Sequence, residues 1–267
     1  MNLKELVKEK MSYGYELKDA RNLVAEEIVI KKISSSEMAE RVTLKGGIVI
    51  YNLSKSDRRV TQDIDFDLIR YSIEEESIKA FISNMNKVND GLLISIEGNI
   101  ENLHQEDYRG VRVHLLIKDK YKNSLRIKLD IGVHSYTAIE QEKMVFCFSS
   151  NDKGVSIKAN PPEQIFAEKL ISLARLGAIS TRYKDIYDFY FLIEECKISP
   201  KKVFDILDLF FTNSKKKPKN IIDLRNAVEA ALGNRTFIEE ASKPASRWID
   251  KDINDIKQTI LNFIDLL

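Results

Sequence analysis

The sequence predicts an α/β fold of the α+β kind, in which a mixed sheet with flanking helices is followed by a helical bundle. Two observations support this prediction. Apolar and polar residues alternate, with the period of a strand, in several segments of residues 61–133. After Pro161 and Pro162 the apolar period is helical as far as the C-terminus. We therefore expect two domains, residues 1–155 and 156–267.

The N-terminal segment is expected to be helical. Apolar residues recur at helical spacing in residues 3–11 and again in residues 23–30. Serines before Glu37 offer N-caps for a short third helix. A glycine pair at residues 46–47 then begins an apolar helical run that continues to Leu53.

The rest of the first domain alternates strand and helix patterns. An acidic strand is expected at residues 61–69, and an amphipathic helix at residues 72–88. Further strands are expected at residues 92–100, 111–117 and 125–133, the last two as a hairpin. The second domain is expected to contain helices at residues 163–178, 184–196, 200–212, 220–232 and 251–266.

Composition limits the class of protein. With 43% hydrophobic and 31% charged residues, the 267-residue chain can bury a substantial core. A formal net charge of +1 gives no general attraction to nucleic acid, so any basic surface must be local. No apolar run approaches the ~18–20 residues that span a membrane. The N-terminal residues lack the apolar core of a signal peptide. We therefore expect a cytoplasmic protein with no membrane partner.

Three aspartates alternate strictly along the expected acidic strand. Asp63, Asp65 and Asp67 fall on one face, because successive side chains of a strand point to opposite faces. Asp130, on a later strand whose opposite face is apolar, would complete a triad with Asp63 and Asp65. Carboxylates suit hard divalent cations such as Mg²⁺, and glycine lets backbone N–H groups approach a phosphate. The structural alternative is a row of solvated carboxylates on the wet face of a sheet.

In this order, the motifs resemble the DNA polymerase β-type nucleotidyltransferase superfamily. Within it they are most similar to the AbiEii/AbiGii toxin family of type IV toxin–antitoxin and phage-abortive systems. The first family motif is matched by Leu44–Gly47 and Thr61–Phe66, and the later ones by Pro161–Leu170 and Arg182–Tyr190. Asp67 is an additional acid, and we favour Asp63 and Asp65 because they match the motif.

The resemblance implies a nucleotidyltransferase fold and a metal-dependent transfer of NMP from an NTP to an acceptor hydroxyl. It suggests RNA as acceptor, at the 3′ end of tRNA, and growth inhibition countered by a separately encoded antitoxin. Two Mg²⁺ ions are expected, held by Asp63, Asp65 and Asp130. The expected catalytic residues are Asp63, Asp65, Asp130, Lys169 and Asp185. The expected nucleotide contacts are Lys45, Gly46, Gly47, Arg59, Thr61, Lys169 and Asp188.

Several of these residues also have a structural interpretation. Lys169 could place its charge on the nucleotide phosphates or extend along the surface as a solvated lysine. Asp185 and Asp188 are neighbours on one helical face, and either orient a cation, assist proton transfer or form a buried salt bridge. A basic turn at residues 55–59 could reach phosphates, although charged turns are more often only solvated.

Three alternative functions stay open at this point. The first is nucleotidyl transfer to a small molecule, such as an aminoglycoside, or to a protein hydroxyl. The second is a non-catalytic module that binds nucleotide or RNA. The third, a purely structural interaction protein, leaves the aspartate row without a reason.

Overall fold

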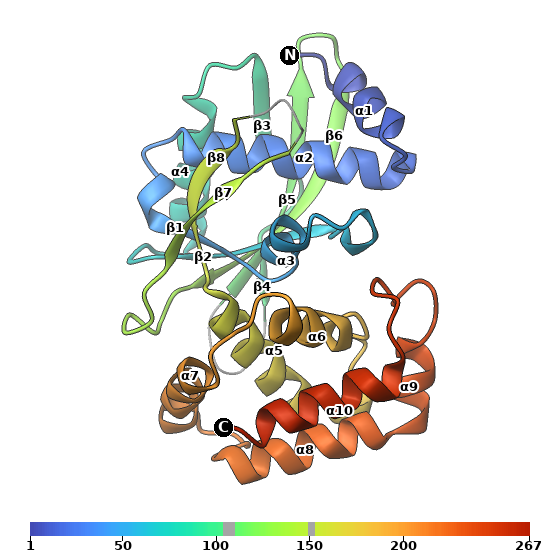
Figure 1. Ribbon diagram of the computed structural model, residues 1–267. Helices are drawn as coiled ribbons and strands as arrows, with labels where there is room; N and C mark the ends of the chain where they lie inside the picture. The colour runs from blue at the N-terminus through green and yellow to red at the C-terminus, as the bar shows by residue number, and fades with distance from the viewer. Residues whose placement is uncertain (104–109, 149–152) are drawn as a thin grey trace. The chain divides into compact units, whose positions relative to one another are not determined.

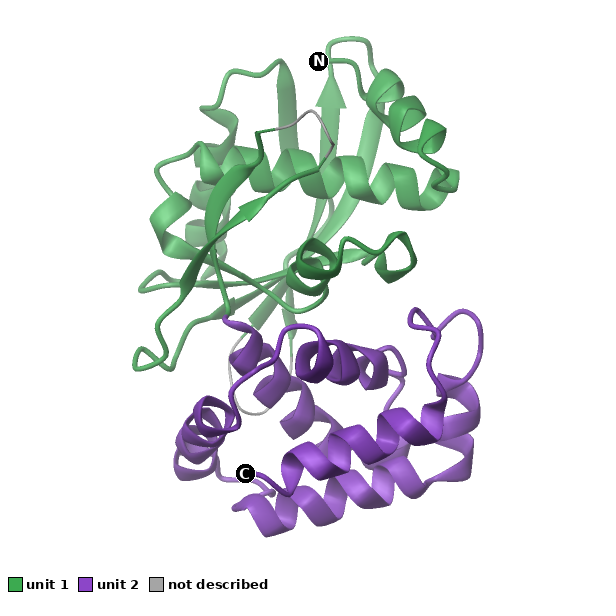
Figure 2. Cartoon of the chain, viewed as in Figure 1, with its two compact units in different colours: residues 1–160 green, residues 161–267 purple. Residues whose placement is uncertain are grey.

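The structure, a computed structural model, describes residues 1–103, 110–148 and 153–267 (Figure 1). The chain forms two compact units, Met1–Asn160 and Pro161–Leu267 (Figure 2). The division lies after β8, Val155–Ala159, because this strand pairs in parallel with β1, Val42–Lys45. The boundary between the units therefore lies one strand further along the chain than the boundary expected at residue 155.

Unit 1 is built on one mixed sheet. Its described strands run in the order β3-β5-β6-β2-β1-β8-β7, with β4 paired to β5. The β2–β6 and β1–β8 pairs are parallel, and the other pairs are antiparallel. The remaining strands are β2 Asp63–Leu68, β3 Leu92–Ile96, β4 Glu101–Leu103, β5 Gly110–Asp119, β6 Ser124–Val133 and β7 Glu142–Phe146.

The alternation in β2 separates an apolar face of the sheet from a charged one. Ile64, Phe66 and Leu68 are fully buried, and the Phe66 ring lies 5.6 Å from that of Phe81 in the helix α4, Glu75–Asn86. The aspartates of β2 therefore point to the face away from α4. We call this second face the carboxylate face.

Three other helices belong to unit 1: α1 Leu3–Ser12, α2 Leu17–Ser34 and α3 Gly47–Ser54. The long α2 crosses the sheet and buries ten of its residues (Figure 1). The separate helix expected near Glu37 is wrong, since Ala39–Arg41 forms a single 3₁₀ turn that leads into β1. β1 begins at Val42, directly after this turn, so the helical segment ends after three residues.

Unit 2 is helical as expected, with one short helix, Arg235–Ala241, that the sequence pattern did not indicate. Side-chain caps fix several helix starts; for example, Ser199 accepts a hydrogen bond from the Lys202 backbone N–H. In the core, Phe166 packs edge-on against Phe189 and Phe263. The helices are α5 Pro162–Leu176, α6 Asp185–Glu194, α7 Pro200–Asn213, α8 Ile221–Gly233, α9 Arg235–Ala241 and α10 Ile253–Ile264.

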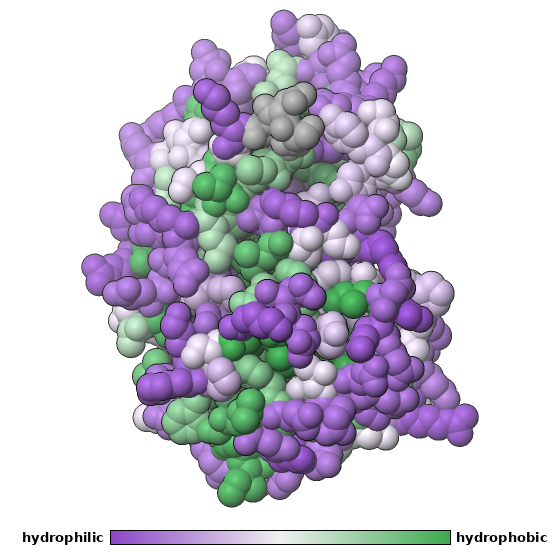
Figure 3. Space-filling view, in the orientation of Figure 1, coloured by the Kyte–Doolittle hydropathy of each residue, from purple (hydrophilic) through white to green (hydrophobic). Residues whose placement is uncertain are grey.

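Hydrophilic side chains cover much of the face drawn in Figure 3, with smaller apolar groups between them. None of the helices in the described ranges is both long enough and apolar enough to span a bilayer. Both findings agree with the ordinary mixture of charged and apolar residues in the sequence.

One buried group works against the stability of unit 1. Glu26 of α2 is 1% exposed, and neither carboxyl oxygen has a hydrogen-bond partner among the described residues. Burial, reinforced by the negative charges of Asp63 and Asp19, raises the pKa of the Glu26 carboxyl well above 4.5. Its neighbour Glu27, in contrast, pairs with Lys10 and Lys31.

We predict that Glu26→Met stabilises the protein, and that the gain grows with pH. A carboxyl whose pKa is raised in the folded state destabilises the folded protein increasingly as the pH rises from the unfolded-state pKa, 4.5, toward the folded-state pKa. Removing it should add about 1 kcal/mol or more to the free energy of unfolding at neutral pH. Urea unfolding at a series of pH values measures this difference. Glu27→Met is the control and should show no gain; an equal gain there would contradict the explanation.

Candidate functional site

The turn between β1 and α3 brings two glycines against the acidic strand. Lys45, the last residue of β1, pairs with Asp65 of the antiparallel β2. Gly46 follows with φ +66°, and a Cβ there would lie 2.9 Å from Asp65 Oδ2. A Cβ on Gly47 would lie 2.8 Å from Thr61 Oγ1. Side chains at either position would collide with the site, so the turn requires both glycines.

The first turn of α3 provides a place for an anion. Its N-cap, Gly46, has no side chain and makes no side-chain cap hydrogen bond to the N–H groups that begin the helix. The helix dipole adds a partial positive charge at this end. The buried Arg59 lies nearby, with one guanidinium nitrogen 3.6 Å from the Cβ position of Gly47. Arg59 is thus part of the site and not of a solvated turn.

The carboxylates form a row on the carboxylate face. Asp63 and Asp65 point from β2, and Asp130 is the direct register partner of Asp65 on the parallel β6. Cations already accompany two of them. Lys128 Nζ lies 2.6 Å from Asp63 Oδ2, and Arg112 makes two 2.8 Å hydrogen bonds to the oxygens of Asp130. This contact raises the pKa of the Arg112 guanidinium above its ordinary value.

Asp67 has a different surrounding from the other two aspartates of β2. It is 5% exposed, and its Oδ1 accepts a 2.6 Å hydrogen bond from Lys45 Nζ. Lys45 is itself buried. Asp67 and Lys45 therefore form an interior ion pair beside the site. This geometry favours Asp63 and Asp65, and not Asp67, as the acids of β2 that would hold a metal.

The donor set fits Mg²⁺ by chemistry, because three carboxylates from adjacent strands offer hard oxygen ligands. Within the described ranges, however, no group of three or more Asp, Glu, His or Cys side chains is arranged to hold a metal ion. Asp63 and Asp130 are turned instead toward Lys128 and Arg112. A metal ion at this row would compete with these cations for the carboxylate oxygens.

A second cluster lies in unit 2. Lys169 of α5 pairs with both Asp185 and Asp188 of α6, with 3.0 Å between Lys169 Nζ and Asp188 Oδ2. Trp248 Nε1 donates a 3.1 Å hydrogen bond to the other oxygen of Asp188. All four side chains are buried. Lys169 is therefore not a solvated lysine, and it balances two carboxylates with one positive charge.

The structure thus groups the expected residues into two sets, one in each unit. Unit 1 brings together the glycine turn, Arg59, Thr61 and the carboxylate row; unit 2 brings together Lys169, Asp185 and Asp188. Sequence reasoning missed the partner groups of both sets. Arg112 and Lys128 carry a weak signal, since they alternate with apolar residues on their strands. Trp248 gave no signal beyond that of an apolar core residue.

Comparison with known proteins adds an independent finding. A family model described as "Nucleotidyl transferase AbiEii toxin, Type IV TA system" matches residues 28–256. The matched span contains both clusters. No curated protein matches the chain. A solved structure, an antigenic nucleotidyltransferase-like protein from Paracoccidioides brasiliensis, is similar with a TM-score of 0.46 and 16% identity, over 82% of this chain and 91% of that one.

We predict that Gly46→Ala and Gly47→Ala each abolish nucleotide binding. The Cβ of Gly46→Ala would push the Asp65 carboxylate, and its backbone conformation would be strained by roughly 1–3 kcal/mol. The Cβ of Gly47→Ala would push Thr61. Calorimetric titration with NTP and Mg²⁺ measures the loss. Gly98→Ala is the control, because Gly98 also has a positive φ but nothing lies within 4 Å of its Cβ position. Wild-type binding by both site variants would contradict the proposed close approach.

We predict that Lys169→Met destabilises the protein strongly. The substitution leaves two buried carboxylates without their shared cation, which typically costs about 3–5 kcal/mol. Chemical unfolding measures the effect. Lys201→Met is the control, since Lys201 pairs with Asp205 at the surface and is 84% exposed; such pairs contribute about 0–1 kcal/mol. Equal small effects in both variants would show that the buried cluster is not a stabilising unit.

Proposed function

The chain belongs to the family of AbiEii nucleotidyl transferase toxins of type IV toxin–antitoxin systems, and from this membership we propose a specific reaction for it. It is a nucleotidyltransferase, with an NTP as substrate and an antitoxin as partner. We propose that it transfers NMP to a hydroxyl of RNA, at the 3′ end of tRNA, in a Mg²⁺-dependent reaction in the cytoplasm. The observation that supports this most directly is the contact of the glycine turn with the carboxylate row.

In this proposal the start of α3 binds the triphosphate. Backbone N–H groups after Gly46 donate to phosphate oxygens, and the helix dipole favours their negative charge. Arg59 adds a nearby positive charge. Asp63, Asp65 and Asp130 would hold Mg²⁺, which supplies charge neutralisation for the phosphates and for the leaving group. These groups are arranged for phosphoryl-type chemistry, in which positioning and electrostatics provide most of the catalysis.

The acceptor hydroxyl attacks the α-phosphorus in line. A new phosphorus–oxygen bond forms to the acceptor, the bond to the β-phosphate oxygen breaks, and pyrophosphate leaves. The proton of the hydroxyl passes to a carboxylate of the row. The product is an RNA extended by one nucleotide, so atoms and charge balance without any further reactant.

The present partners of the carboxylates have a role in the same proposal. If Asp63 and Asp130 held a metal ion, Lys128 and Arg112 would have to share these carboxylates with it. The phosphates of the nucleotide can take the place of these anions, since guanidinium and ammonium groups both bind phosphate. We propose that the Lys169–Asp185–Asp188 cluster holds α5 and α6 in position, because the amine of Lys169 is shared between two carboxylates of α6.

We predict that purified protein with Mg²⁺, total bacterial RNA and one α-labelled NTP at a time moves label into tRNA-sized RNA. Asp65→Asn should reduce the rate at least ~100-fold, because it removes a carboxylate of the row. Gel electrophoresis of the labelled RNA gives the rate, and the active NTP identifies the donor.

Two further results complete this test. Asp67→Asn should mainly lower the melting temperature, because it removes the negative charge of the buried Lys45–Asp67 ion pair. If NTP binds but no RNA is labelled, the acceptor is a small molecule or a protein and the RNA proposal is wrong. If no Mg²⁺-dependent NTP binding occurs at all, the site assignment itself is wrong.

A further inference from the structure

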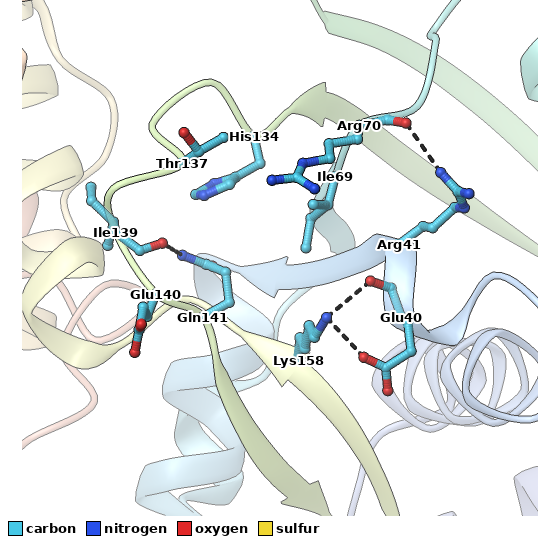
Figure 4. A pocket seen from close by; sticks show the side chains of 10 residues that line it. All are labelled: Glu40, Arg41, Ile69, Arg70, His134, Thr137, Ile139, Glu140, Gln141 and Lys158. Carbon is cyan, nitrogen blue, oxygen red and sulfur yellow. Dashed lines mark hydrogen bonds and ion pairs between the residues drawn. The ribbon is translucent and has the colours of Figure 1, made fainter.

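A hollow of about 600 Å³ opens in unit 1 where β1 begins and where β2 and β6 end (Figure 4). Arg41 precedes β1, Ile69 and Arg70 follow β2, and His134 follows β6. Strand pairing continues to this point, since Ile69 N–H donates to Arg41 O at 2.8 Å and His134 N–H to Leu68 O at 3.0 Å. The hollow is therefore part of the sheet and not of a loop alone.

The hollow lies on the carboxylate face. Lys158, which lines it from β8, pairs in register with Thr43, and Thr43 pairs with Asp67. Register partners point to the same side of a sheet. Ile69 follows Asp65 by four residues, which places the hollow ~13 Å along β2 from the glycine turn. Asp67 and Thr43, which lie between the two places on this face, are buried, so a chain molecule would reach both places only by passing over the residues that cover them.

Two arginines give the hollow an excess of positive charge. Across the described residues no acid forms an ion pair with Arg41 or Arg70. The Arg41 guanidinium donates to the Arg70 carbonyl oxygen at 3.2 Å. The side chain of Arg70 points away from Arg41, and its guanidinium extends toward His134 (Figure 4). Both side chains are exposed and can turn to a ligand.

The nearby acid Glu40 does not cancel this charge. It is held by Lys143 at 2.7 Å and by Lys158 at 2.8 Å. Hydrogen bonds from these two lysines lower the pKa of Glu40 to about 2. Glu40 is thus matched by two cations of its own. Glu140, on the opposite wall, is the remaining acid of the lining.

The shape of the hollow suits a polymer. Its apolar surface comes from Ile69 and the buried Ile139, while Arg41, Arg70 and Thr137 at its margin are exposed. An apolar base with cations at the margin matches the sugars and phosphates of a nucleic-acid strand. His134 is buried in one wall, and this burial lowers the pKa of its imidazole.

We propose that this Arg41–Arg70 hollow binds the sugar–phosphate backbone of the acceptor RNA, upstream of the hydroxyl that reacts at the carboxylate row. The inference rests on the proposed transfer to RNA. At ~3.4 Å per stacked nucleotide, the ~13 Å between hollow and glycine turn corresponds to about four nucleotides. The two arginines would contact two phosphates of that segment.

The test uses the full chain and a double variant, Arg41→Ala with Arg70→Gly. Arg70 has φ +51°, so glycine removes the guanidinium without adding strain. The probe is a short fluorescein-labelled single-stranded RNA, followed by anisotropy at several salt concentrations. We expect at least ~10-fold weaker binding, and a salt slope lower by about 1.4, since each single-strand phosphate contact contributes about 0.7. Melting temperature and NTP binding should not change.

The control is Lys79→Ala with Lys87→Ala, which removes two exposed cations from or beside α4, the helix on the apolar face of the sheet. It should bind RNA like wild type. Equal RNA affinity of the wild type and the Arg41/Arg70 variant would overturn the proposal. It would also be overturned if the variant lost binding to an acidic protein and still bound RNA like the wild type. In the labelling reaction the KM for RNA should rise and the KM for NTP should not.

Failure of the inference and failure of the proposed function give different results. If the wild type labels RNA and the Arg41/Arg70 variant does so with the same KM, the hollow is not an RNA site although the reaction stands. If RNA binds at the hollow and is never labelled, the hollow is supported and the proposed reaction is wrong.

Discussion

The close approach of Asp65 to Gly46 is the constraint on which the rest of unit 1 depends. Because Lys45 is paired opposite Asp65, the chain leaving β1 must turn immediately beside that carboxylate. Only a residue without a Cβ and with a positive φ can do so. The turn directs α3 so that its first turn begins next to the carboxylate row. Thr61 lies directly against Gly47.

Neighbouring charges give three similar aspartates different roles. In the sequence the three aspartates occupy equivalent positions of one alternating pattern. Only the residues that contact them from neighbouring strands distinguish them. Asp67 is matched by a buried lysine and belongs to the interior, whereas Asp63 and Asp65 stay at the partly exposed end of the strand. This arrangement allows one strand to contribute both to stability and to a binding site.

Sequence analysis found the elements whose pattern is strong over many residues. β2, the β5–β6 hairpin and the long helices of unit 2 follow from period alone, as does the one-sided placement of Asp63, Asp65 and Asp130. It missed β1, β4, β7 and β8, which are short, show no clear alternation and are defined by the strands they pair with. For the same reason it missed Arg112 and Lys128, whose contacts depend on register between strands.

In the proposed reaction, the ion pairs at the carboxylate row would couple metal binding to nucleotide binding. Mg²⁺ would compete for the oxygens of Asp63 and Asp130 with Lys128 and Arg112, and would weaken the attraction of these two cations to their carboxylates. A triphosphate that binds at the same time would place its negative charge near Lys128 and Arg112 and would offset this loss. By linkage each ligand then raises the affinity for the other by the same factor. In this proposal the protein would bind Mg²⁺ more tightly when NTP is present, and Mg²⁺ titration with and without NTP measures that difference.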